Sequence, residues 1–153
     1  MTSIPAFHVS GRSKAEGKGL IFIQSRKDLS SSGTFTIAVN VKFNPATDDY
    51  PTGTIKIKTD LNDSLKTIFT STSIELINSY GRSNPTIYLT GRCKPLAERS
   101  PKGLRYWIMI ADNRRDQQGT QDIAGFVIHD RQGNRVAYGT GPLKSGDIKV
   151  EPS

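Results

Sequence analysis

The stretch GTFTIAVNVKF, residues 33–43, decides the fold because apolar and polar residues alternate along its length. The apolar residues occupy every second position: Phe35, Ile37, Val39, Val41 and Phe43. Successive side chains of a β-strand point to opposite faces, so this alternation predicts a long strand with one buried face. The segment GTIKIKT, residues 53–59, repeats the pattern with isoleucines on one face and lysines on the other.

Further candidate strands follow at short spacing, each bounded by Gly, Pro, Asn, Asp or Ser. They are GKGLIFIQ (17–24), KTIFTSTSIELINSY (66–80), PTIYLTGRCK (85–94), LRYWIMIAD (104–112), IAGFVIHD (123–130), RVAYGTG (135–141) and DIKV (147–150). The residues from Asp130 to Asn134 predict a hairpin turn around Gly133. The only helical competitor is TDLNDSLKTIF, residues 59–69, whose apolar residues also fit one helix face after Asp60 as a cap.

About eight or nine strands, with turn residues between them and at most one short helix, predict an antiparallel β-sandwich or a closed β-barrel. The 153 residues fit a single domain. We expect residues 1–16 to be a flexible N-terminal segment and residues 17–153 to form the all-β domain. The segments YWIMIA (106–111) and GFVI (125–128) are apolar on both faces. They predict central strands, or strands whose second face meets something other than water.

Composition excludes several functional classes. The 21 basic and 14 acidic side chains give a net charge of +7, but the basic residues are scattered and match no nucleic-acid-binding motif, so nucleic acid is an unlikely partner. No run approaches the roughly 18 apolar residues of a membrane helix, so no membrane span is expected. The chain has no P-loop, G-x-S-x-G or H-E-x-x-H motif, and no cofactor is expected. The lone Cys93 lies in phase with buried positions and predicts a structural thiol.

The loop after residue 111, DNRRDQQGTQD (112–122), is rich in charge. Asp112, Asp116 and Asp122 offer hard oxygen donors, which calcium prefers. The spacing does not match the EF-hand pattern, and Arg114 and Arg115 lie between the carboxylates. A plain inter-strand loop is the favoured interpretation, and a calcium site or a ligand contact is the alternative.

Aromatic residues form a second candidate site. An exposed aromatic ring offers apolar area to the C–H face of a sugar, while polar neighbours bond its hydroxyls. Trp107, Tyr88, Arg92 and Arg105 are the residues expected to contact such a ligand. The alternative is that Trp107 packs in the core or at a sheet edge.

His129 is the candidate for acid–base chemistry, because it ends a predicted strand beside Asp130. In an enzyme, it would act with Arg92, Tyr106 or Asp112 across an internal cavity. A structural, hydrogen-bonded histidine is the favoured alternative.

The order of the segments from Gly17 to Val150 resembles the post-COAP-type β module, a small all-β domain of bacterial secreted and surface proteins, often appended to other domains. The closing portion carries most of the likeness: Asp112 after a strand, Asp122 before the next, the D-x-x-G hairpin at Asp130 to Gly133, a tyrosine, and GDIKV. The resemblance implies a sandwich or barrel in an extracellular setting. It transfers no catalytic residue.

These observations favour a non-catalytic β module, secreted or at the cell surface, that binds a glycan or another polyhydroxylated or anionic ligand. The alternative is a small β-barrel enzyme of the cyclase, isomerase or dehydratase type, acting on a hydrophobic metabolite and then cytoplasmic. The first residues, MTSIPAFHVSGRSK, lack the features of a secretory signal, as those of a mature secreted protein also would.

Overall fold

The computed structural model describes residues 12–23, 33–61, 66–81, 85–96, 103–113 and 121–152. These residues form eight β-strands: β1 (Ser13–Ile23), β2 (Gly33–Phe43), β3 (Thr52–Leu61), β4 (Lys66–Tyr80), β5 (Thr86–Pro95), β6 (Leu104–Ala111), β7 (Ile123–His129) and β8 (Arg135–Pro152). The described residues contain no α-helix.

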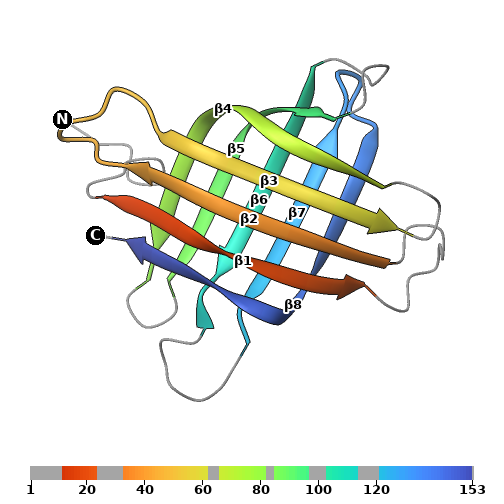
Figure 1. The fold of residues 1–153 in the computed structure, drawn as a ribbon. Helices are drawn as coiled ribbons and strands as arrows, with labels where there is room; N and C mark the ends of the chain where they lie inside the picture. The colour runs from red at the N-terminus through yellow and green to blue at the C-terminus, as the bar shows by residue number, and fades with distance from the viewer. Residues whose placement is uncertain are drawn as a thin grey trace.

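The strands close into a barrel (Figure 1). Each strand pairs antiparallel with the next along the chain, and β1 also pairs antiparallel with β8. Closure gives each of these strands a partner on both sides over at least part of its length, so none is a free edge strand. The shortest pairing joins Lys56–Asp60 of β3 to Lys66–Thr70 of β4. The all-β prediction is therefore confirmed, and of its two forms the barrel is the observed one.

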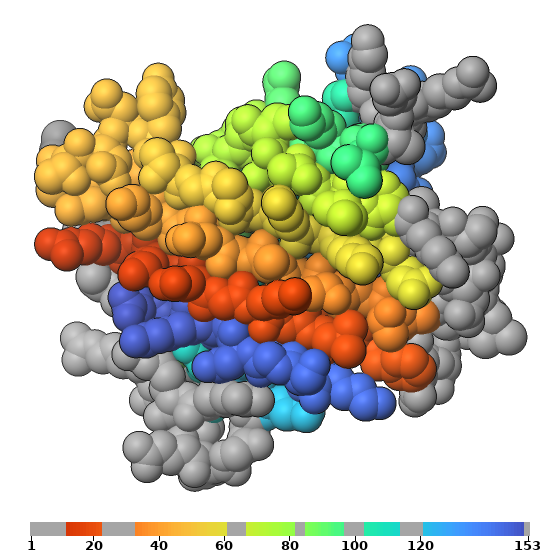
Figure 2. Space-filling model, viewed as in Figure 1, coloured from red at the N-terminus to blue at the C-terminus, as the bar shows by residue number. Residues whose placement is uncertain are grey.

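The interior of the barrel holds the apolar positions that the alternation predicted. Phe35, Ile37, Val39 and Val41 of β2 are buried, as are the inward residues of the other strands. The ring of Phe35 meets that of Phe126 on β7 edge to face, with centroids 4.6 Å apart. β1, β2, β3 and the last part of β8 form a continuous outer face (Figure 2).

Three expected elements or boundaries differ in the structure. The proposed helix over residues 59–69 is wrong, because its ends belong to β3 and β4. The segments 135–141 and 147–150 are parts of one long strand, β8, in which the glycine-rich stretch between them stays extended and carries a β-bulge opposite Leu20 and Ile21. β1 starts at Ser13, four residues before the expected start of the domain.

The hairpin and cysteine predictions are confirmed. The amide of Asp130 donates to the carbonyl of Asn134 at 2.9 Å, and Gly133 has the positive φ that the turn requires. Cys93 is buried, and burial raises the pKa of its thiol to about 11. The thiol therefore stays protonated at neutral pH and packs as a small apolar group.

Candidate ligand-binding groove

The outer surface of the barrel has two faces of different character. On β1, β2 and β3 the outward positions are mainly charged or polar and include Lys14, Glu16, Lys18, Asn40, Lys42, Lys56 and Lys58. On β4, β5 and β6 the outward positions expose the large apolar side chains of Leu76, Tyr80, Tyr88 and Trp107. Contiguous apolar patches on a protein surface mark interaction sites. The face built by β4 to β8 is therefore the candidate site.

The four exposed apolar side chains border one groove of about 450 Å³. The rest of its outward-facing lining comes from Asn78, Thr90, Met109, Gly125, Val127 and Thr140. None of the described residues that line the groove is charged. Its volume lies within the range of roughly 300–1,000 Å³ that is usual for small-molecule sites.

The strand register places small residues between large ones along this face. One row, which we call the tryptophan row, crosses five strands and consists of Leu76, Thr90, Trp107, Val127 and Tyr138. The next row consists of Asn78, Tyr88, Met109, Gly125 and Thr140. Outward residues of one strand are two positions apart, so the rows lie about 7 Å from each other. Thr90 and Gly125 are low points between the taller aromatic side chains.

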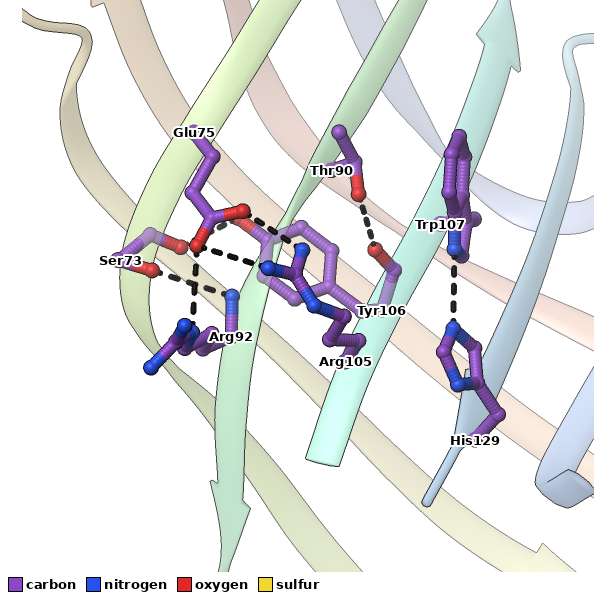
Figure 3. Close-up of polar contacts among 8 residues, drawn as sticks. All are labelled: Ser73, Glu75, Thr90, Arg92, Arg105, Tyr106, Trp107 and His129. Atoms are coloured by element: carbon purple, nitrogen blue, oxygen red, sulfur yellow. Dashed lines mark hydrogen bonds and ion pairs between the residues drawn. The ribbon is translucent and has the colours of Figure 1, made fainter. Parts of the chain in front are cut away.

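Trp107 is held in a defined orientation on this surface. Its side chain is 54% exposed, so it does not pack in the core. Its indole Nε1 donates a hydrogen bond to Nε2 of His129 at 3.1 Å (Figure 3). For Nε2 to accept, the proton of a neutral imidazole must lie on Nδ1, which is 3.0 Å from the carbonyl oxygen of Asp130. His129 therefore positions the indole ring.

A second aromatic pair lies across β4 and β5. The rings of Tyr80 and Tyr88 meet edge to face with centroids 6.0 Å apart. The side-chain amide of Asn78, which is buried, donates to the hydroxyl of Tyr80. The groove thus combines aromatic faces with hydroxyl and amide groups.

An ion-pair cluster borders the groove on the side of Trp107. Glu75 is the extra residue of a β-bulge in β4, which turns its carboxylate toward β5 and β6. Oε2 lies 2.6 Å from Nη1 of Arg105, and Oε1 lies 3.3 Å from Nε of Arg92 (Figure 3). Both guanidinium groups therefore share one carboxylate.

Tyr106 lies on the opposite side of the sheet from these residues. It is buried inside the barrel, and its hydroxyl donates to the backbone carbonyl of Ser73 at 2.8 Å. The hydroxyl reaches Ser73 across Gly91, which has no side chain in the way. Burial raises the pKa of this phenol, so it remains a neutral donor.

Two buried carboxylates lie between β6 and β7 in the chain: Asp112 follows β6 directly, and Asp122 precedes β7. Oδ2 of Asp112 accepts a hydrogen bond from the amide of Val150 at 3.1 Å. Asp122 accepts from the amides of Asn113 at 3.0 Å and Ile148 at 3.1 Å. Carboxylate oxygens of Asp112, Asp122 and the exposed Asp147 lie within 4.8 Å of one another, which is a spacing that a cation could bridge. The backbone contacts, however, give Asp112 and Asp122 a structural role in fastening β8.

The pKa of Asp122 is raised to about 6, mainly by burial. The amide of Ile148 lowers this pKa, while a hydrogen bond with Asp147 and the nearby charges of Asp112 and Asp147 raise it. The usual value is 3.8. The folded state binds a proton at Asp122 more tightly than the unfolded state does, so protonation of Asp122 stabilises the fold. This contribution is complete below about pH 4 and is lost as the pH rises through about 6. A rise of about two pKa units corresponds to a contribution of at most about 3 kcal/mol to the free energy of unfolding.

We therefore expect the free energy of unfolding of the unchanged protein to fall, relative to that of Asp122→Asn, between about pH 4 and pH 7. The asparagine cannot titrate, so the difference between the two proteins isolates this carboxyl group from all others. Urea unfolding of both proteins across this range measures it. Parallel pH profiles would show that Asp122 titrates normally in the folded state.

The structure brings some of the sequence-predicted residues together and separates others. Trp107, Tyr88, Arg92 and Arg105 lie on the one outer face, although only Trp107 and Tyr88 line the groove itself. The four residues considered for an enzyme do not surround a common cavity: His129 and Arg92 are outside, Tyr106 is inside, and Asp112 is at the far end of β6. Asp116, Arg114 and Arg115 lie outside the described residues.

Comparison with protein-family models, curated proteins and solved structures finds no match to this chain. The resemblance to the post-COAP-type module therefore stays a prediction. In the described part of the chain, no helix has the length and apolar character needed to cross a membrane.

Proposed function

We propose that the protein is a non-catalytic glycan-binding module, acting outside the cell or at its surface. The observation that carries the proposal is the gathering of Trp107, Tyr88 and Tyr80 around one open groove on the outside of the barrel. Aromatic faces at a surface bury the C–H side of sugar rings, which is the main apolar contact that a carbohydrate offers.

Polar groups between the rings support the same ligand class. The hydroxyl groups of Tyr88 and Thr140 and the side chain of Asn78 line the groove beside the aromatic faces. A sugar presents hydroxyls around the rim of its ring, so it needs donors and acceptors next to a stacking surface. The groove is open along the sheet, which suits a polymer that extends beyond the residues it contacts.

The orientation of Trp107 also supports a binding role. A ring that is held by His129 before the ligand arrives loses little conformational freedom on binding, and this preorganisation favours affinity. A tryptophan exposed on a barrel surface without such a ligand has an unfavourable apolar contact with water.

We expect Trp107→Ala to weaken glycan binding at least about tenfold, because central aromatic contacts typically contribute 2 kcal/mol or more to binding. The measurement is affinity electrophoresis in gels that contain soluble polysaccharides, preceded by a glycan-array screen. Tyr50→Ala is the matched control, since Tyr50 is 76% exposed and does not line the groove. Absence of binding by the unchanged protein to every glycan, or equal loss in both variants, would contradict the proposal.

A further inference from the structure

A row of basic side chains crosses the outer face directly beside the tryptophan row. Arg92, Arg105, His129 and Arg135 lie opposite one another on β5, β6, β7 and β8, and we call them the arginine row. Neighbouring strands are about 4.8 Å apart, so the row extends for roughly 14 Å. It runs parallel to the tryptophan row at a distance of about 7 Å along β5 to β7.

The arginine row has an excess of positive charge. Among the described residues, Glu75 is the one carboxylate that forms ion pairs with it, through Arg92 and Arg105. Arg135 contacts the ring of Tyr138, with its guanidinium carbon 4.2 Å from the ring centroid, and has no ion pair with any described residue. Among the described residues, the row thus has three arginines and one carboxylate, which pairs with two of them.

This arrangement leaves one exposed cation available to a further anion. Like charges directly opposite each other on neighbouring strands destabilise a sheet, and Glu75 offsets this repulsion between Arg92 and Arg105. Arg135 lies opposite His129 and forms no ion pair with a described residue. Arginine also presents a planar fork that matches a carboxylate, and Glu75 shows a carboxylate bound in that way here.

We infer that the ligand of the groove is an acidic polysaccharide whose sugars carry carboxylate groups, as uronic acids do. A ring stacked on Trp107 places a carboxylate that it carries toward Arg105 and Arg135, on either side of His129. This inference rests on the proposed glycan-binding function and adds the charge of the ligand to it. The groove is aromatic and uncharged, so it is assigned to the sugar ring. The arginine row beside it is assigned to the carboxylate.

The experiment compares polygalacturonate with its methyl-esterified form, because esterification removes the charge and keeps the sugar chain. Dextran and dextran sulfate serve as a second pair, in which the anion is a sulfate. Affinity is measured by electrophoresis or calorimetry with the full chain, at low and at moderate salt. We expect polygalacturonate to bind at least about tenfold more tightly than the ester at low salt, with the difference shrinking as salt is added.

Two variants separate the arginine row from the overall basic charge of the protein. Arg135→Gln is expected to reduce the preference for polygalacturonate several-fold, whereas Lys56→Gln, which removes the same charge from the opposite face, leaves it unchanged. Thermal unfolding of both variants shows whether they keep the fold. The comparison of polygalacturonate with its ester uses the unchanged protein, so it remains a test even if a variant does not fold.

The possible results lead to different conclusions. Equal affinity for the acid and its ester would overturn the inference and leave the glycan-binding function standing. Equal effects of Arg135→Gln and Lys56→Gln would also overturn it, because the preference would then come from net charge alone. Binding of dextran sulfate without polygalacturonate would overturn the assignment of a carboxylate. Binding to none of the four polymers, nor to any other glycan, would contradict the proposed function itself.

Discussion

Replacing Asp122 by alanine is expected to lower the free energy of unfolding by about 2–4 kcal/mol near pH 4, where its carboxyl group is protonated and carries no buried charge, because it removes the acceptor of two backbone amides. The amide of Ile148 lies at a buried position of β8 and has no route to water after the change. The amide of Asn113 is less enclosed and contributes the smaller part. The hydrogen bond to Ile148 holds the part of β8 that pairs with β1 and closes the barrel, which we call the seam.

Two matched variants test this explanation for Asp122. Asp122→Asn keeps one oxygen that can accept a hydrogen bond, so we expect a smaller loss than for alanine. Asp49→Asn changes an exposed carboxylate between β2 and β3, away from Asp122, and we expect an effect within about 0.5 kcal/mol, as for most surface substitutions. Urea unfolding near pH 4 measures all three. A loss for Asp122→Ala no greater than that for Asp49→Asn would show that the buried hydrogen bonds do not stabilise the seam.

The strands could be predicted from sequence because alternation is a local property. The residues of 33–43 specify a two-sided strand without reference to any other segment. Closure depends instead on pairing between β1 and β8, which lie at opposite ends of the chain. A sandwich and a barrel use the same alternation, so the sequence left both open. The short apolar segment at 59–69 was ambiguous because its residues fit either period.

The candidate groove was predictable only in part. The two-sided apolar character of residues 106–111 and 125–128 indicated an outer face that meets something other than water, and these strands do line the groove. The contribution of β4 was hidden by its two β-bulges, which shift the alternation so that Ile74 and Ile77 both lie opposite inward positions of β5. Gly125 gave no signal, because a low point in a surface results from a missing side chain.

The acidic residues illustrate the same limit of local patterns. Asp112 and Asp122 were recognised as oxygen donors from their loop. Each of them accepts a hydrogen bond from a backbone amide of β8, and Asp147 also lies on that strand, far along the chain from both. These groups come together because β8 pairs with β7 as far as Pro142 and continues beyond it along β1. Their role in holding the seam follows from the fold and not from spacing.

Gly91→Ala is expected to lower the free energy of unfolding by about 3–5 kcal/mol, through overpacking and the loss of a buried hydrogen bond. A β-carbon at this position would overlap the backbone carbonyl oxygen of Ser73 and lie 2.6 Å from the hydroxyl of Tyr106. Ser73 is fixed by the sheet and Tyr106 by the core, so neither can move without breaking the bond between them.

Gly125→Ala is the matched control, since it adds the same methyl group to a glycine in another strand of the same sheet. There the β-carbon would lie 2.8 Å from Oγ1 of Thr140, which can rotate away at little cost. We expect a change in stability below about 1 kcal/mol, as for surface positions without a fixed neighbour. The methyl group would, however, enter the floor of the groove and weaken glycan binding. Urea unfolding and affinity electrophoresis of both variants test the two statements together, and equal destabilisation by both substitutions would contradict the contact between Tyr106 and Ser73 as the reason for a glycine at position 91.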